Sequence, residues 1–164
     1  MRISLTGWKV QEVYEERLGE VFRGLYAKGE DQLLLRVDVR DSIVSDTAVV
    51  YIRGKIAGMK ARYDNNRSPY PGLLSDEIHC DEGLKPTYST FLTQSGKEIQ
   101  MIEGYLNDRL TFGSCTKDQI VYKGIKVLFS CQQHKQLYDM EFIALVSSFT
   151  QEKIESLVKS LQCR

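Results

Sequence analysis

The feature that most limits how this chain can fold is a series of short, strand-like segments separated by turn-forming residues. The clearest segment, residues 32–40 (QLLLRVDVR), alternates apolar and charged side chains from Leu35 to Arg40. Successive side chains of a strand point to opposite faces of a sheet, so this pattern predicts a half-buried strand. Strands that are joined by short turns pair antiparallel, and the series therefore predicts an antiparallel sheet.

A hairpin is predicted directly after this strand. Residues 47–53 (TAVVYIR) are rich in β-branched and aromatic side chains, and Gly54-Lys55 suits a two-residue turn before residues 56–63. Later segments with the same strand and turn signals lie at residues 88–93, 98–106, 109–112, 119–132 and 136–146. Together they predict a sheet of about six to eight strands.

A helix is predicted at the N-terminus, because apolar side chains there recur at spacings of three and four. Thr6 can cap its start, and Gly29 suits the position just after its end. Gly19 and Gly24 inside the segment disfavour a helix by about 1 kcal/mol each relative to alanine. The apolar side chains with this spacing are Val10, Val13, Tyr14, Leu18, Val21, Phe22 and Leu25.

A second helix is predicted at the C-terminus, where Thr150 or Ser148 can act as the N-cap. Each predicted helix has a single apolar stripe, which is typical of a helix that packs on a sheet. We therefore expect an α+β fold with the N-terminal and C-terminal helices on one face of the sheet. The apolar stripe of the second helix consists of Phe149, Ile154, Leu157, Val158 and Leu161.

Length and charge limit the classes of function. A chain of 164 residues predicts one globular domain, residues 1–164. The chain contains 22 basic residues (Lys plus Arg) and 22 acidic residues (Asp plus Glu), so its formal net charge is zero. Without a net positive charge it has no overall electrostatic attraction to phosphate backbones, and we expect no nucleic-acid partner. The apolar stretch at residues 142–149 is too short for a membrane span. No signal peptide is visible, which favours a cytoplasmic location.

The usual chemical signatures are missing from the sequence. It has no glycine-rich nucleotide loop, no nucleophile elbow and no zinc-protease motif, and it contains only two histidines. The four cysteines form no Cys-x-x-Cys pair; free thiols are expected, with two disulfides as the alternative. No cofactor is expected, and no catalytic residue is assigned.

Two weaker interpretations involve the cysteines. Cys131 and His134 could bind a structural zinc from one turn, and His79-Cys80 could supply further ligands. A thiol-dependent enzyme or redox protein would use Cys80 or Cys131. The acidic residues close to Cys80 disfavour the thiolate that such chemistry needs.

The best candidate site in the sequence is the irregular loop at residues 64–75 (DNNRSPYPGLLS). Recognition surfaces are commonly rich in tyrosine and arginine and are often formed by loops, and proline restricts the shape of this one. We therefore expect a non-catalytic binding or interaction module that uses this loop and the adjacent sheet surface. Its partner would be a protein or a small molecule. The candidate binding residues are Tyr63, Asp64, Asn66, Arg67 and Tyr70.

Overall fold

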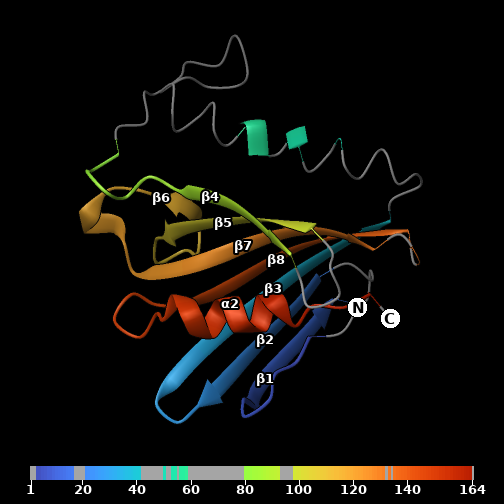
Figure 1. The fold of residues 1–164 in the computed structure, drawn as a ribbon. Helices are drawn as coiled ribbons and strands as arrows, with labels where there is room; N and C mark the ends of the chain where they lie inside the picture. The colour runs from blue at the N-terminus through green and yellow to red at the C-terminus, as the bar shows by residue number, and fades with distance from the viewer. Residues whose placement is uncertain are drawn as a thin grey trace.

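The structure is a computed structural model that describes residues 3–16, 21–41, 50, 53–54, 56–58, 80–92, 98–131, 133 and 135–163. In this part of the chain, one antiparallel sheet of eight strands is covered on one face by a C-terminal helix (Figure 1). The strands are β1 (Lys9–Glu16), β2 (Val21–Lys28), β3 (Asp31–Asp41), β4 (Thr87–Leu92), β5 (Glu98–Leu106), β6 (Phe112–Ser114), β7 (Tyr122–Cys131) and β8 (Gln136–Leu145). The helix is α2 (Gln151–Lys159), and a short 3-10 helix, η1 (Lys117–Gln119), precedes β7.

The strand order is β1-β2-β3-β8-β7-β5-β4, and β6 pairs with β5 outside this path. Consecutive strands form hairpins at both ends of the chain, while β3 pairs with β8, which lies about a hundred residues later in the sequence. This long-range pairing joins the N-terminal and C-terminal hairpins into one sheet. Strands β8 and β7 lie near the middle of the sheet, and β1 and β4 are its edges.

The predicted strands from residue 32 onward are largely confirmed. The alternating segment 32–40 forms β3, the predicted hairpin of residues 88–106 forms β4 and β5, and the last predicted hairpin forms β7 and β8. Only the three-residue β6 corresponds to the predicted segment 109–112. The sheet and its antiparallel pairing therefore follow from the sequence pattern.

The predicted N-terminal helix is wrong, because residues 9–16 and 21–28 form strands β1 and β2, which pair antiparallel. Gly24 gives the physical reason. The Tyr26 ring folds back over it, and a Cβ on Gly24 would lie 2.6 Å from Cε2 of Tyr26. The glycine that weakens a helix is thus the residue this strand needs, and the valines and aromatic residues around it favour a strand.

Gly29, expected at the end of that helix, lies in the turn between β2 and β3. Its φ is +64°, and its neighbours Lys28 and Asp31 are paired across the hairpin. A helix C-cap and a tight hairpin turn both need a residue that accepts positive φ, so the same glycine fits either structure. This ambiguity contributed to the incorrect helix prediction.

The hairpin predicted for residues 47–63 is also wrong where the structure describes it. Val50, Arg53, Gly54 and residues 56–58 are helical and lie on the side of the sheet away from α2 (Figure 1). Ile56 packs there against Leu128 and Leu137 of the sheet. Packing of Ile56 on the sheet outweighs the local β propensity of this segment.

The C-terminal helix is confirmed, with Thr150 at its N-cap position. It packs on the main core, which includes Val127, Phe129, Met140 and Phe142 of β7 and β8. No helix in the described part of the chain is long and apolar enough to cross a membrane. The buried side chains that α2 and the residues after it place on the sheet are Ile154, Leu157, Val158 and Leu161.

Candidate binding site

The N-terminal segment lies beside α2, so the two ends of the chain meet at one place (Figure 1). The backbone N–H of Ser4 donates a hydrogen bond of 3.0 Å to Oγ of Ser160, at the end of α2. The Ser160 hydroxyl in turn donates to the carbonyl oxygen of Leu157 at 2.6 Å. Trp8 from the same segment is half-buried against the main core, which fixes the segment along the helix.

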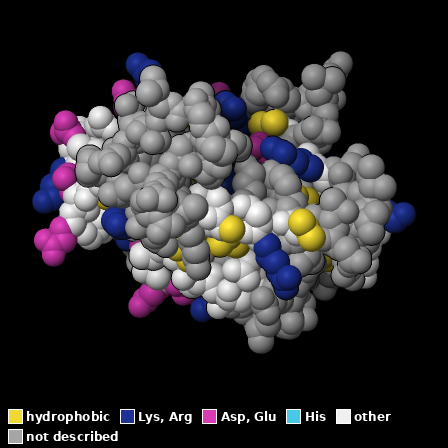
Figure 2. All heavy atoms as spheres, turned by 90° about the horizontal axis from the view of Figure 1, so that it is seen from above, with side chains coloured by type: hydrophobic (Ala, Val, Ile, Leu, Met, Phe, Trp, Pro, Cys, Tyr) yellow, Lys and Arg dark blue, Asp and Glu magenta, His cyan; other side chains and the backbone are white. Residues whose placement is uncertain are grey.

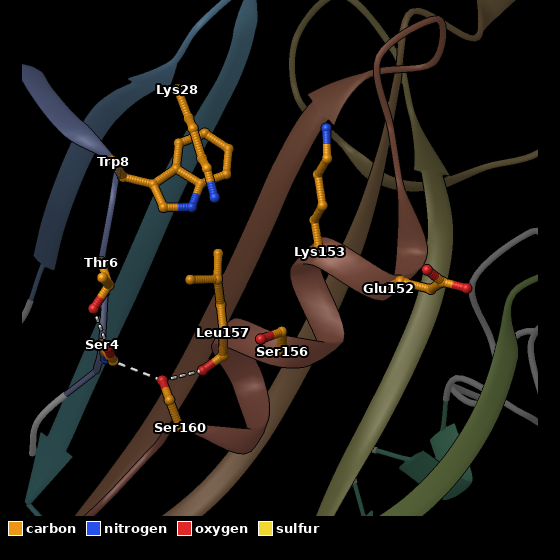
Figure 3. Close-up of a pocket in the computed structure, with 9 residues that line it drawn as sticks. All are labelled: Ser4, Thr6, Trp8, Lys28, Glu152, Lys153, Ser156, Leu157 and Ser160. Carbon is orange, nitrogen blue, oxygen red and sulfur yellow. Dashed lines mark hydrogen bonds between the residues drawn. The ribbon is translucent and has the colours of Figure 1, made fainter.

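A pocket of about 430 Å³ opens between this segment, the end of β2 and α2 (Figure 3). The N-terminal segment and β2 form one wall, and α2 forms the other. The lining side chains are Ser4, Thr6, Trp8, Lys28, Glu152, Lys153, Ser156, Leu157 and Ser160. The pocket is open to solvent on one side and mainly polar, with Trp8 and Leu157 as its apolar surfaces.

Gly7 forms the turn before Trp8 and lies beside the Lys28 side chain. Its φ is +83°, which favours glycine, and a Cβ at this position would lie 3.4 Å from Cε of Lys28. A larger residue would therefore be strained by its backbone conformation, while its Cβ would make only ordinary van der Waals contact with the lysine side chain. The turn at Gly7 thus brings Trp8 and Lys28 to the same wall.

The charges that line the pocket are not equivalent. Lys153 forms an ion pair with Asp31, whereas Lys28 has no ion-pair or hydrogen-bond partner among the described residues. The side chain of Glu152 extends away from the other lining side chains (Figure 3). Lys28 is therefore the unpaired positive charge of the pocket among the described residues.

A second polar cluster lies on the opposite face of the sheet, where Arg36, Lys126, Asp139 and Glu141 come from adjacent strands. Lys126 Nζ lies 2.9 Å from Oδ1 of Asp139 and 3.0 Å from Oε1 of Glu141. Arg36 Nη1 lies 3.1 Å from Oε2 of Glu141. The side chains of Asp139 and Glu141 are only 6% and 10% exposed, so this ionic network is largely buried.

The network is electrically balanced, with two cations facing two carboxylates. The Arg36 guanidinium also donates to the carbonyl oxygen of Leu110 at 3.1 Å. Two ion pairs of the network lack hydrogen-bond geometry: the one from Lys126 to Oδ1 of Asp139 and the one from Arg36 to Oε2 of Glu141. Complementary charge, with few free hydrogen-bonding groups, indicates a structural role for the network.

We expect the free energy of unfolding to fall at alkaline pH, because three buried groups have raised pKa values. Burial lowers the pKa of Lys126, but the charges of Glu141 and Asp139 outweigh burial and raise that pKa above its usual 10.5. Burial raises the pKa of both Tyr26 and Tyr138 above the usual 10.0. The folded state therefore holds these protons more tightly than the unfolded chain, and the resulting stability is present at neutral pH and is lost as the pH rises above about 10.

Urea unfolding at a series of pH values checks this expectation. The midpoint should stay level up to about pH 9.5 and then fall, because that is where the unfolded groups begin to lose protons. The Tyr26→Phe/Tyr138→Phe variant keeps both rings and removes both ionisable hydroxyls, so its midpoint should fall less steeply. An unchanged midpoint at about pH 11 in the unmodified protein would contradict the expectation.

Figure 2 views the molecule from the side opposite α2, where some of the described residues can be seen. Basic and acidic side chains of those residues are both visible, with small apolar spots between them (Figure 2). Within the described chain, no group of three or more His, Cys, Asp or Glu side chains could hold a metal ion.

The cysteines differ from the expectation of free thiols. Cys80 is bonded to Cys115 and Cys131 to Cys163, with Cα–Cα distances of 4.8 and 5.6 Å. Such distances are typical of disulfides. The sulfurs that the thiol-dependent and zinc interpretations require are therefore already paired in this structure, and His134 and His79 lie outside the described residues.

The loop at residues 64–75 lies outside the described residues, as do all the binding residues predicted there: Tyr63, Asp64, Asn66, Arg67 and Tyr70. The pocket residues Ser4, Trp8 and Lys28 were missed by the sequence interpretation. Nothing local marks them, because the pocket exists only where the N-terminal segment meets a helix more than 140 residues later.

No known protein family and no curated protein matches the sequence of this chain.

Proposed function

We propose that this domain is a non-catalytic binding module that holds a small polar ligand in the pocket between its N-terminal segment and α2. The observation that carries the proposal is the pocket itself. Its volume of about 430 Å³ lies in the range of ligand sites, which is roughly 300–1,000 Å³. It combines an aromatic surface, Trp8, with several polar groups, as binding sites for small molecules commonly do.

The hydroxyl groups of the pocket favour binding over catalysis. Ser160 donates to a backbone carbonyl, and Oγ of Ser4 lies 2.9 Å from Oγ1 of Thr6. A serine nucleophile needs an adjacent general base, and among the described residues none of the hydrogen bonds of Ser4, Thr6 and Ser160 joins a hydroxyl to a lysine or a carboxylate. These hydroxyls thus shape the pocket and supply hydrogen bonds to a ligand.

The loop at residues 64–75 stays a predicted second contact surface of the same module, on the strength of its tyrosine, arginine and proline content. Tyr63, Arg67 and Tyr70 remain its leading residues. Its partner could be a protein or a small molecule, whereas the pocket fits only a small molecule.

Trp8 provides a direct test, because it is the only tryptophan in the chain and it lines the pocket. Titration with small polar compounds should change its fluorescence in a saturable way. The Ser156→Phe variant places a ring in the pocket from an exposed helix position, so it should abolish that change without lowering the melting temperature. A response that persists unchanged in Ser156→Phe would contradict binding in the pocket.

A further inference from the structure

We infer that the ligand of this pocket is a small organic anion, whose carboxylate or phosphate group is bound by Lys28 and the neighbouring donors. The inference rests on the function proposed above and specifies the class of ligand. It follows from the available hydrogen-bonding groups, from the balance of charge and from the apolar parts of the lining.

The polar groups that remain available around Trp8 can all donate a hydrogen bond. Among the described residues, Nζ of Lys28, Nε1 of Trp8 and the hydroxyl of Ser156 have no hydrogen-bond partner. An ammonium group and an indole N–H can donate but cannot accept. A ligand that satisfies this set must present acceptors, and a carboxylate or phosphate presents several on one group.

The balance of charge also favours an anion. The Lys153–Asp31 ion pair is neutral as a unit, and Glu152, although it lines the pocket, points away from Lys28 and the other lining side chains (Figure 3). Lys28 therefore contributes a positive charge that no described carboxylate neutralises. Lys153 lies in the first turn of α2, where the helix dipole adds a partial positive charge.

The apolar parts of the lining favour an organic anion over a bare inorganic ion. The Trp8 ring and the Leu157 side chain supply the apolar parts of the lining, one from each wall of the pocket (Figure 3). An aromatic side chain gains most when a flat, apolar group packs against it. The ligand thus combines a small flat or apolar body with a single anionic group.

Three small probes separate these features: benzoate, phenyl phosphate, and benzamide as the uncharged analogue of benzoate. Each is titrated into the full chain, with Trp8 fluorescence as the readout. Benzoate or phenyl phosphate should bind at least about tenfold more tightly than benzamide, because a hydrogen bond to a charged group is stronger than a neutral one. The preference between the two anions distinguishes a carboxylate from a phosphate ligand.

The variant Lys28→Met should weaken anion binding at least about tenfold and leave benzamide binding unchanged. Lys117→Met is the matched control, since Lys117 is exposed in η1 and does not line the pocket. Anion affinity in the unmodified protein should also fall as NaCl is raised, which tests the charge without any substitution.

The outcomes separate this inference from the proposed function. If benzamide binds as tightly as benzoate and Lys28→Met has no effect, the anion inference is overturned and the pocket still binds ligands. If none of the three probes changes the Trp8 signal, the anion inference is overturned, while the broader function is judged by its own screen of polar compounds. Anion binding that weakens in Lys28→Met, but not in Lys117→Met, supports both.

Discussion

Replacing Lys126 with methionine is expected to lower the free energy of unfolding by about 3–5 kcal/mol, the loss that is typical when one partner of a buried ion pair is removed. Lys126 contacts both Asp139 and Glu141, and its own side chain is only 15% exposed. Glu141 keeps its contact with Arg36 in the variant, but Asp139 loses the only cation found near it among the described residues. Methionine fills a similar volume, so the loss reports the charge rather than a cavity.

Urea unfolding of three variants measures this effect. Lys159→Met is the control, because Lys159 pairs with Glu155 on the surface, with 49% of its side chain exposed, and such pairs contribute at most about 1 kcal/mol. The double variant Lys126→Met/Asp139→Leu should recover part of the loss, because apolar residues can replace a buried ion pair with little penalty. If Lys126→Met loses no more stability than Lys159→Met, the network does not stabilise the sheet through its charges.

The network shows where strand alternation stops being informative. The sequence correctly places Arg36 and Asp38 on one face of β3 and Leu35 and Val37 on the other. In an isolated strand, the charged face is expected to be solvated. Arg36 instead pairs across the sheet with Glu141, and this pairing depends on which strand lies next to β3. That neighbour is set by tertiary contacts, which the local pattern does not contain.

The N-terminal hairpin shows a different limit. Apolar residues from Val10 to Leu25 satisfy a helical spacing, and β2 also satisfies the spacing of a strand, with Gly24 and Tyr26 buried on one face. Two apolar periods can coincide over a short segment, and packing then decides between them. The C-terminal segment has no alternative strand pattern, because the spacing of Ile154, Leu157 and Val158 fits a helix alone. The sequence therefore predicts this helix correctly.

The pocket could not be predicted from the sequence, because its walls are distant in the chain. Ser4 and Ser160 are joined by a hydrogen bond across 156 positions, and each is an ordinary polar residue in its own segment. The cysteines present the same difficulty, since their spacing leaves three pairings open. Only the fold brings Cys131, at the end of β7, next to Cys163 after α2.

Removal of the Cys131–Cys163 disulfide is expected to lower the free energy of unfolding by about 3–4 kcal/mol, because the bond closes a loop with a sequence separation of 32 residues. A Cys131→Ala/Cys163→Ala variant removes the bond without adding a polar group to the buried Cys131 site. Intact mass first establishes the bonds. The native protein should take up no alkylating reagent, and the reduced, unfolded protein should take up four equivalents, one for each cysteine.

The other disulfide provides the matched control, since Cys80 and Cys115 have a similar separation of 35 residues and neither lines the pocket. The chain-entropy argument predicts a similar loss of stability for both alanine pairs. Cys163 follows α2 and packs on the same core as Trp8, so only the Cys131→Ala/Cys163→Ala variant should also shift Trp8 emission and weaken ligand binding. Four thiols that react in the native protein would contradict both bonds. Equal effects of the two variants on Trp8 would show that the C-terminal disulfide does not hold α2 against the pocket.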